Sequence, residues 1–152
     1  MAHHAGCLCG QVRITINAEP TGARHCWCRL CQYLSAGAGT VNLAFPSDAV
    51  QVNGDIRWHD SVADSGNAMQ RGFCPQCGTP LLSRAEARPA VVIVRAGALD
   101  NPSLLAPQME IWTSTAPIGP ALIPTSPIIP RRTRNSRDWG LRAPGKPVAS
   151  LP

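Results

Sequence analysis

Seven cysteines in three clusters constrain this chain more than any other feature of its sequence. The clusters are Cys7 and Cys9; Cys26, Cys28 and Cys31; and Cys74 and Cys77. An odd number of cysteines excludes a complete disulfide framework within one chain. A disulfide within a C-x-C pair is also disfavoured, because the bond requires a specific Cα separation. We therefore interpret the cysteines as metal ligands.

Two of the clusters predict a closed zinc site. Zinc accepts thiolate ligands in a tetrahedral arrangement, and structural sites have four protein ligands. "GCLCG" contributes Cys7 and Cys9, and "FCPQCGTPL" contributes Cys74 and Cys77, with Gly78 placed to adopt a positive φ. Each pair is incomplete alone, so we predict one structural zinc held by all four. It would join the N-terminal segment to a hairpin about 65 residues later.

The third cluster, "HCWCRLC", supplies only three ligands, Cys26, Cys28 and Cys31. Catalytic zinc sites keep three protein ligands and an open position, so the trio predicts a second, exchangeable zinc. Two alternatives stay open at this stage. His25 or His59 could supply a fourth ligand and make this site structural too, or the trio could hold no metal and Cys31 could be an ordinary buried cysteine.

The charge of a three-thiolate zinc restricts its chemistry. Its formal charge is −1, so it acidifies bound water poorly, which argues against a hydrolase. It is suited to accept an incoming thiol as a fourth soft ligand. Arg24 and Arg29 flank the trio and could offset the negative charge, or could simply be solvated.

The first part of the chain predicts a β-rich domain. In "QVRITINAE", the apolar residues Val12, Ile14 and Ile16 alternate with polar ones, as in a half-buried strand. Further strands are expected at 39–45, 49–54, 55–61, 91–97 and 108–114, with a hairpin turn at "VNGD" and a turn or two of helix after Cys28. We expect His3 and His4 to lie in a frayed terminus, and Trp58 and Trp112 to be core aromatics.

Charge and proline content change abruptly after Ala116. Residues 1–116 contain eight basic and eight acidic residues, whereas residues 117–152 contain six basic residues, one acidic residue and eight of the fifteen prolines. Frequent prolines exclude helix interiors and central strands. We interpret 117–152 as a disordered or loosely extended Pro/Arg-rich tail, or as a segment read in an altered frame. No export signal or membrane span is visible, so a cytoplasmic protein is expected.

The motifs "GCLCG", "HCWCRLC", "RGFCPQCGTPL", "GALDNP" and "EIWTSTAP" together resemble the glutathione-dependent formaldehyde-activating enzyme family, also called the centromere protein V/GFA domain family. The resemblance covers about residues 5–116. It implies a compact, mainly β "β-tent" domain of short antiparallel strands stapled by zinc. It also implies that Cys7, Cys9, Cys74 and Cys77 hold the structural zinc and that Cys26, Cys28 and Cys31 hold the zinc required for activity.

The activity implied by this resemblance is a carbon–sulfur lyase reaction, in which glutathione and formaldehyde condense reversibly to S-hydroxymethylglutathione. Zinc would be the cofactor at both sites, and glutathione or a similar small thiol the co-substrate. A homodimer is left open, and neither a membrane nor a nucleic acid is expected as a partner. The alternative function is a non-enzymatic zinc module that binds protein or nucleic acid, for which the basic tail is the main argument.

Overall fold

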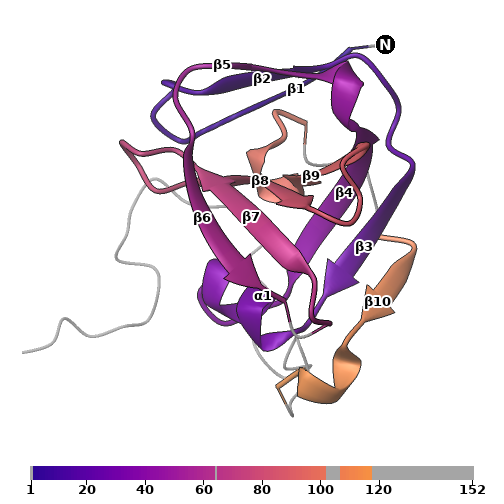
Figure 1. Cartoon of the computed structure of the whole chain (residues 1–152). Helices are drawn as coiled ribbons and strands as arrows, with labels where there is room; N and C mark the ends of the chain where they lie inside the picture. Colours follow the sequence, from indigo (N-terminus) through magenta and orange to yellow (C-terminus); the bar gives the residue numbers. More distant parts are fainter. Residues whose placement is uncertain (1, 64, 102–106, 118–152) are drawn as a thin grey trace, which may run out of the picture. The chain divides into compact units, whose positions relative to one another are not determined.

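The computed structural model of the chain describes residues 2–63, 65–101 and 107–117. These residues form a mainly β structure of two sheets with one short α-helix (Figure 1). The strands are β1 (His3–Gly6), β2 (Arg13–Ile16), β3 (Gly22–Cys26), β4 (Thr40–Pro46), β5 (Val50–Asn53), β6 (Arg57–Val62), β7 (Ala68–Phe73), β8 (Pro80–Ala85), β9 (Val91–Arg95) and β10 (Met109–Ile111). The helices are α1 (Arg29–Leu34) and the 3₁₀ turns η1 (Ser47–Ala49), η2 (Ala96–Ala98) and η4 (Thr113–Thr115).

The strands are arranged in a three-stranded sheet, β1-β2-β5, and a seven-stranded sheet, β10-β3-β4-β9-β8-β7-β6. All pairs are antiparallel except β10 with β3, which is parallel. In Figure 1 the three-stranded sheet lies at one end of the larger sheet, and α1 lies at the other. The expected mainly β class is confirmed.

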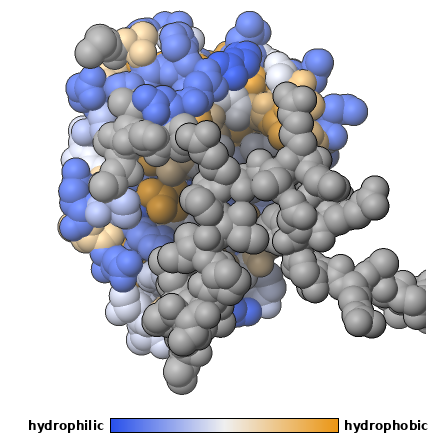
Figure 2. Space-filling view, turned by 180° about the vertical axis from the view of Figure 1, so that it is seen from behind, coloured by the Kyte–Doolittle hydropathy of each residue, from blue (hydrophilic) through white to orange (hydrophobic). Residues whose placement is uncertain are grey.

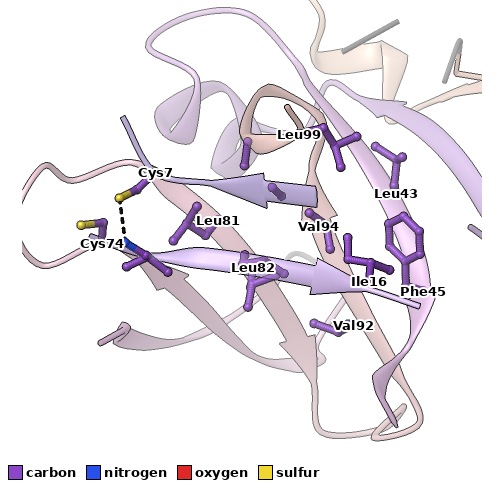
Figure 3. Packing of buried hydrophobic residues seen from close by; sticks show 14 of the residues in the cluster. Cys7, Ile16, Leu43, Phe45, Cys74, Leu81, Leu82, Val92, Val94 and Leu99 are labelled. Carbon is purple, nitrogen blue, oxygen red and sulfur yellow. Dashed lines mark hydrogen bonds between the residues drawn. The ribbon is translucent and has the colours of Figure 1, made fainter. Parts of the chain in front are cut away.

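The apolar core lies between the two sheets. Val12, Ile14 and Ile16 are fully buried, which confirms the alternation expected of this strand. They belong to one cluster with Leu43 and Phe45 of β4 and with residues of β8 and β9 (Figure 3). Burying a side chain of this size contributes about 1.5–3 kcal/mol, so this layer supplies much of the stability.

The opposite face of the large sheet is polar although it is buried. Successive residues of a strand point to opposite faces, and in β4 the core residue Leu43 alternates with Thr40 and Asn42. Both polar side chains are buried, as are Ser83 of β8 and Arg95 of β9 on the same face. Hydrophobic packing cannot explain why these polar side chains are buried. They lie at the end of the molecule where α1 begins.

The molecular surface is largely hydrophilic on the uncovered part of the face in Figure 2, with apolar colour in small patches. The exposed large apolar side chains among the described residues are Leu8, Tyr33, Val52, Val62, Met109 and Trp112. The expectation that Trp112 is a core aromatic is therefore wrong. Trp58 packs against the core, with the Arg84 guanidinium 3.8 Å from its ring centroid.

The N-terminal expectation is also wrong, because His3 and His4 lie in β1. His3 is paired with Ile16 and is buried, and its Nε2 lies 3.1 Å from a carboxylate oxygen of Glu19. "HHAG" has no β-branched residue, so local propensity gave no sign of a strand. Pairing with β2, whose Ile14 and Ile16 are buried in the core, forms it.

The expected hairpin at "VNGD" is wrong as well. β5 pairs with β2 and β6 pairs with β7, so the turn carries the chain from one sheet to the other. Gly54 has φ +104°, and a Cβ on it would lie 2.2 Å from the carbonyl oxygen of Gln11. The glycine is needed for a close approach of two backbone segments.

No helix in the described part of the chain is long and apolar enough to cross a membrane. The Pro/Arg-rich tail predicted at 117–152 lies outside the described residues, apart from Pro117.

Candidate metal centres

The structure brings the four cysteines of the predicted structural site together. Cys7 and Cys9 lie between β1 and β2, and Cys74 and Cys77 lie between β7 and β8. Cys9 Sγ is 3.5 Å from Cys7 Sγ and 3.8 Å from Cys74 Sγ, and all four sulfurs lie within 4.8 Å of one another. Figure 3 shows Cys7 and Cys74 at one end of the apolar core.

Two glycines shape the loops that carry these sulfurs. Gly10 and Gly78 have φ +79° and +72°, which confirms the positive φ expected for Gly78. Each closes a turn, with its N–H donating to the carbonyl of Cys7 and Cys74 respectively. The loops thus direct their cysteines toward a common point.

The chemistry of the four sulfurs fits zinc. A zinc–sulfur distance near 2.3 Å gives a tetrahedral edge of about 3.8 Å, close to the sulfur separations found here. The Val12 N–H donates to Cys7 Sγ at 3.2 Å. The Thr79 hydroxyl, 3.1 Å from Cys77 Sγ, lowers the pKa of Cys77 to about 5. These contacts favour the thiolate form that zinc requires.

The second cluster lies where β3 ends and α1 begins. Cys26 is the last residue of β3, Cys28 precedes α1, and Cys31 is in its first turn. Cys26 Sγ and Cys28 Sγ are 3.5 Å apart, the Cys31 N–H donates to Cys28 Sγ at 3.4 Å, and the three sulfurs lie within 4.8 Å of one another. These sulfur separations also fit a tetrahedron around zinc. No described residue supplies the fourth ligand.

Neither histidine considered as a fourth ligand joins the trio among the described residues. His25 alternates with Cys26 along β3, so the two side chains point to opposite faces of the sheet. Its Nδ1 lies 3.5 Å from a carboxylate oxygen of Glu110 on β10. His59 is exposed on β6, the edge strand of the large sheet.

A positive charge does face the trio, but it comes from Arg95 rather than from the flanking arginines. Arg95 is 9% exposed, and its guanidinium donates to Ser83 Oγ at 2.6 Å, to Asn42 Oδ1, and to Thr40 Oγ1 at 3.4 Å. Burial lowers the pKa of Arg95, and the charge of Cys31 acts in the opposite direction. Arg29 is exposed and contacts Gln32 and the Tyr33 ring instead.

Interactions within the trio shift the pKa values of Cys26 and Cys31 in opposite directions. A hydrogen bond with Cys26 is the main cause that lowers the pKa of Cys31 to about 5, and Thr40, Cys28 and Arg95 act in the same direction. The same hydrogen bond raises the pKa of Cys26. The buried arginine therefore favours a thiolate within the trio.

A distant segment fixes the loop that carries the trio. Gln32 Nε2 donates to the carbonyls of Trp27 at 2.6 Å and of Thr115 at 2.7 Å. The Thr115 hydroxyl also donates to the Trp27 carbonyl, and the Trp27 N–H donates to Ile111. The β10–η4 segment thus holds the Cys26–Cys31 loop in place, and Gln32 is the buried link between them.

Two cavities adjoin α1 on the polar side of the sheet. One, of about 360 Å³, is lined by Leu34, Thr40, Val41, Thr79, Arg95 and neighbouring residues. The other, of about 270 Å³, is lined by Tyr33, Leu34, Arg71, Phe73, Pro80, Arg95 and neighbouring residues. Arg95 lines both, so a small molecule in either cavity lies next to this guanidinium.

Sequence reasoning missed Arg95, Arg71, Thr40 and Gln32. One signal was present, since Arg95 ends the run "VVIV", and a cation after four β-branched residues is unusual in a buried strand. Gln32 follows directly after the last cysteine of the trio and carries no signal of its own. Their roles depend on which strands become neighbours.

Comparisons with known proteins agree with this architecture. A family model described as "Glutathione-dependent formaldehyde-activating enzyme" matches residues 2–115. The crystal structure of a Rhodobacter sphaeroides protein is similar, with a TM-score of 0.55 at 20% sequence identity, covering 70% of this chain and 98% of that one. A search of curated proteins found no significant match. The extent of the family match shows that this chain belongs to the glutathione-dependent formaldehyde-activating enzyme family.

Proposed function

We propose that the protein is a zinc-dependent carbon–sulfur lyase acting on the adduct of a small thiol, such as glutathione, with formaldehyde or another small aldehyde. The observation that carries this proposal is the set of three mutually close thiols, Cys26, Cys28 and Cys31, without a fourth ligand among the described residues. The family match supports the same reaction class.

The two cysteine clusters would have different tasks. Cys7, Cys9, Cys74 and Cys77 would hold a closed zinc that joins the loops β1–β2 and β7–β8. Cys26, Cys28 and Cys31 would hold a second zinc, which when bound supplies an open position for a thiolate sulfur. That three-thiolate site would have a formal charge of −1. It is therefore better suited to exchanging a thiolate ligand than to lowering the pKa of bound water.

The reaction balances without any redox partner. In the condensing direction, the substrate thiol loses its proton, its sulfur forms a bond to the aldehyde carbon as the carbonyl π bond breaks, and the resulting oxyanion takes up a proton. In the reverse direction the hydroxyl loses its proton, the carbonyl π bond forms again as the carbon–sulfur bond breaks, and the thiolate takes up a proton. No electrons are gained or lost overall, so the reaction needs no redox cofactor.

Residues around the trio would support this chemistry by position and charge. Arg95 places a buried positive charge beside the anionic sulfurs. Gln32 keeps the loop in register through two short hydrogen bonds. The adjoining cavities give a thiol and a small aldehyde room next to α1.

The test measures zinc content and activity of the purified protein. We expect two zinc ions per chain in the wild type and one in Cys28→Ser, because only the trio loses a ligand. Turnover is measured as glutathione-dependent exchange between free formaldehyde and its adduct by NMR, and we expect Cys28→Ser to abolish it. Gln51→Ala, at an exposed position of β5, is the control that should keep both ions and the activity.

A single zinc, unchanged by Cys28→Ser and by added thiol, would contradict the proposal. That result would instead favour the non-enzymatic zinc module that sequence analysis left as the alternative.

A further inference from the structure

Two arginines lie together on the polar face of the large sheet. Arg71 of β7 is directly opposite Ser83 of β8, and residues opposite each other in antiparallel strands point to the same face. Arg95 of β9 donates from Nη2 to the hydroxyl of the same Ser83 at 2.6 Å. Ser83 is therefore paired with Arg71 across the strands and bonded to Arg95 through its hydroxyl.

Neither arginine has a carboxylate partner among the described residues. Arg95 donates to the hydroxyls of Thr40 and Ser83 and to the amide oxygen of Asn42, and the anionic groups that act on it are the thiolates of the trio. Arg95 Nε and Arg71 Nη1 are buried without any hydrogen-bond partner. Leaving a buried charged donor unpaired is unfavourable, so a group that accepts from these arginines would be stabilised here.

The two side chains share a cavity beside α1, and Arg95 interacts electrostatically with Cys31 of the trio. Arg71 and Arg95 both line the cavity of about 270 Å³, together with Tyr33 and Leu34. Those two residues belong to α1, the helix that also carries Cys31. A molecule whose sulfur lies at the trio can therefore extend along α1 toward the arginines.

The unpaired donors of the two arginines match the acceptor geometry of a carboxylate. A carboxylate fits the planar fork of a guanidinium and can accept two hydrogen bonds from it. A neutral thiol offers no such acceptor.

We propose that Arg71 and Arg95 form a carboxylate-binding subsite that selects small thiols bearing a carboxylate group, and their aldehyde adducts, over neutral thiols. This inference rests on the proposed function in placing the substrate sulfur at the trio. The carboxylate accepts hydrogen bonds from the two guanidinium groups and displaces no carboxylate among the described residues.

The subsite is tested with four small ligands that differ only in the sulfur and the carboxyl group. They are 3-mercaptopropionate, 3-mercaptopropionamide, and the S-methyl derivative of each. Their affinities for the zinc-loaded full chain are measured by ligand-observed NMR. Comparing carboxylate with amide reports on the arginines, whereas comparing thiol with methyl thioether reports on the open metal site.

We expect each carboxylate to bind about tenfold more tightly than its amide, because hydrogen bonds to charged groups contribute that much or more. In Arg71→Gln the preference should fall to nearly equal affinities, and Arg71→Lys should restore part of it. Arg84→Gln is the matched control, since Arg84 lies on the other face of β8 over Trp58, and it should keep the full preference. Thermal unfolding of each variant verifies that it is folded.

Equal binding of carboxylate and amide by the wild type, or a preference unchanged in Arg71→Gln, would overturn the subsite. Failure of all four ligands to bind would overturn it too. Equal binding of thiol and methyl thioether, with the carboxylate preference intact, would instead contradict the proposed function and leave the arginines as an anion site.

Discussion

The sulfur of Cys9 lies 3.8 Å from the sulfur of Cys74, although 65 residues separate the two in the chain. Cys9 is exposed in the loop after β1, and Cys74 is fully buried at the end of β7. The contact joins the small sheet to the large one at the edge of the apolar core. A metal at this point closes a long loop of the chain, and its removal affects the whole domain.

We expect the Cys74→Ser variant to bind one zinc ion fewer than the wild type. Its melting temperature should be lower by about 10 °C or more, since metal binding at such a site is coupled to folding. Zinc content and thermal unfolding measure the two effects. Cys28→Ser is the matched control, which should also lose one ion but change the melting temperature much less. Equal destabilisation by both variants would contradict separate structural and exchangeable sites.

Gln32→Ala should lower the free energy of unfolding by about 1–3 kcal/mol, because it removes two hydrogen bonds, one to the Trp27 carbonyl and one to the Thr115 carbonyl. Chemical denaturation measures this loss. Gln51→Ala on the exposed strand β5 should stay within about 0.5 kcal/mol of the wild type. Activity should fall in Gln32→Ala even at temperatures where the variant is folded, since the loop of the trio loses its link to β10–η4.

Gly54→Ala should destabilise the protein by about 2 kcal/mol or more, because strain from the positive φ adds to a clash with the Gln11 carbonyl. Gly66→Ala provides the control. Gly66 also has a positive φ, +82°, but a Cβ there meets nothing within 4 Å, so only the backbone cost of about 1 kcal/mol is expected. Equal losses in the two variants would show that the close approach of Gly54 to Gln11 is unimportant for stability.

The ion pair of Arg13 and Asp100 predicts a pH dependence. The Arg13 guanidinium donates to the Asp100 carboxylate, with Nη1 3.1 Å from Oδ1, and holds the pKa of Asp100 below its ordinary value of 3.8. Because the folded-state pKa is the lower one, the pair stabilises the fold above about pH 4, and this contribution is lost as the pH falls through the folded-state value.

Both side chains of this pair are about half exposed, so Asp100→Asn should cost only about 0.2–1 kcal/mol at pH 7. Denaturation of variant and wild type, compared at pH 7 and below pH 4, measures the difference and cancels acid effects common to both. The difference should shrink in acid and also at 1 M salt. A difference that is independent of both pH and salt would contradict the electrostatic origin.

The strand pattern shows how far local sequence predicts this fold. The alternation of Val12, Ile14 and Ile16 was sufficient to predict a strand here. One face of β2 lies on the core, and an apolar residue at every second position indicates such a strand directly. The hairpin expected at Cys74 and Cys77 is formed by β7 and β8, although no strand bounds were predicted for it. β1 and β3 were not predicted, since their sequences include glycine or charged residues and lack a clear alternation. They become strands because their neighbours in the sheet offer hydrogen-bonding edges.

The sequence by itself determined the grouping of the cysteines, because short spacers bring thiols together locally and the count of four plus three follows from the spacing. It also determined the family. Only the tertiary structure decided which charge faces the trio and which backbone groups hold its loop. Arg95 is far in sequence from Thr40 and Asn42, and Gln32 is far from Thr115, and only the folded chain brings these residues together. Such long-range neighbours follow from sheet topology, which local patterns of residues do not encode.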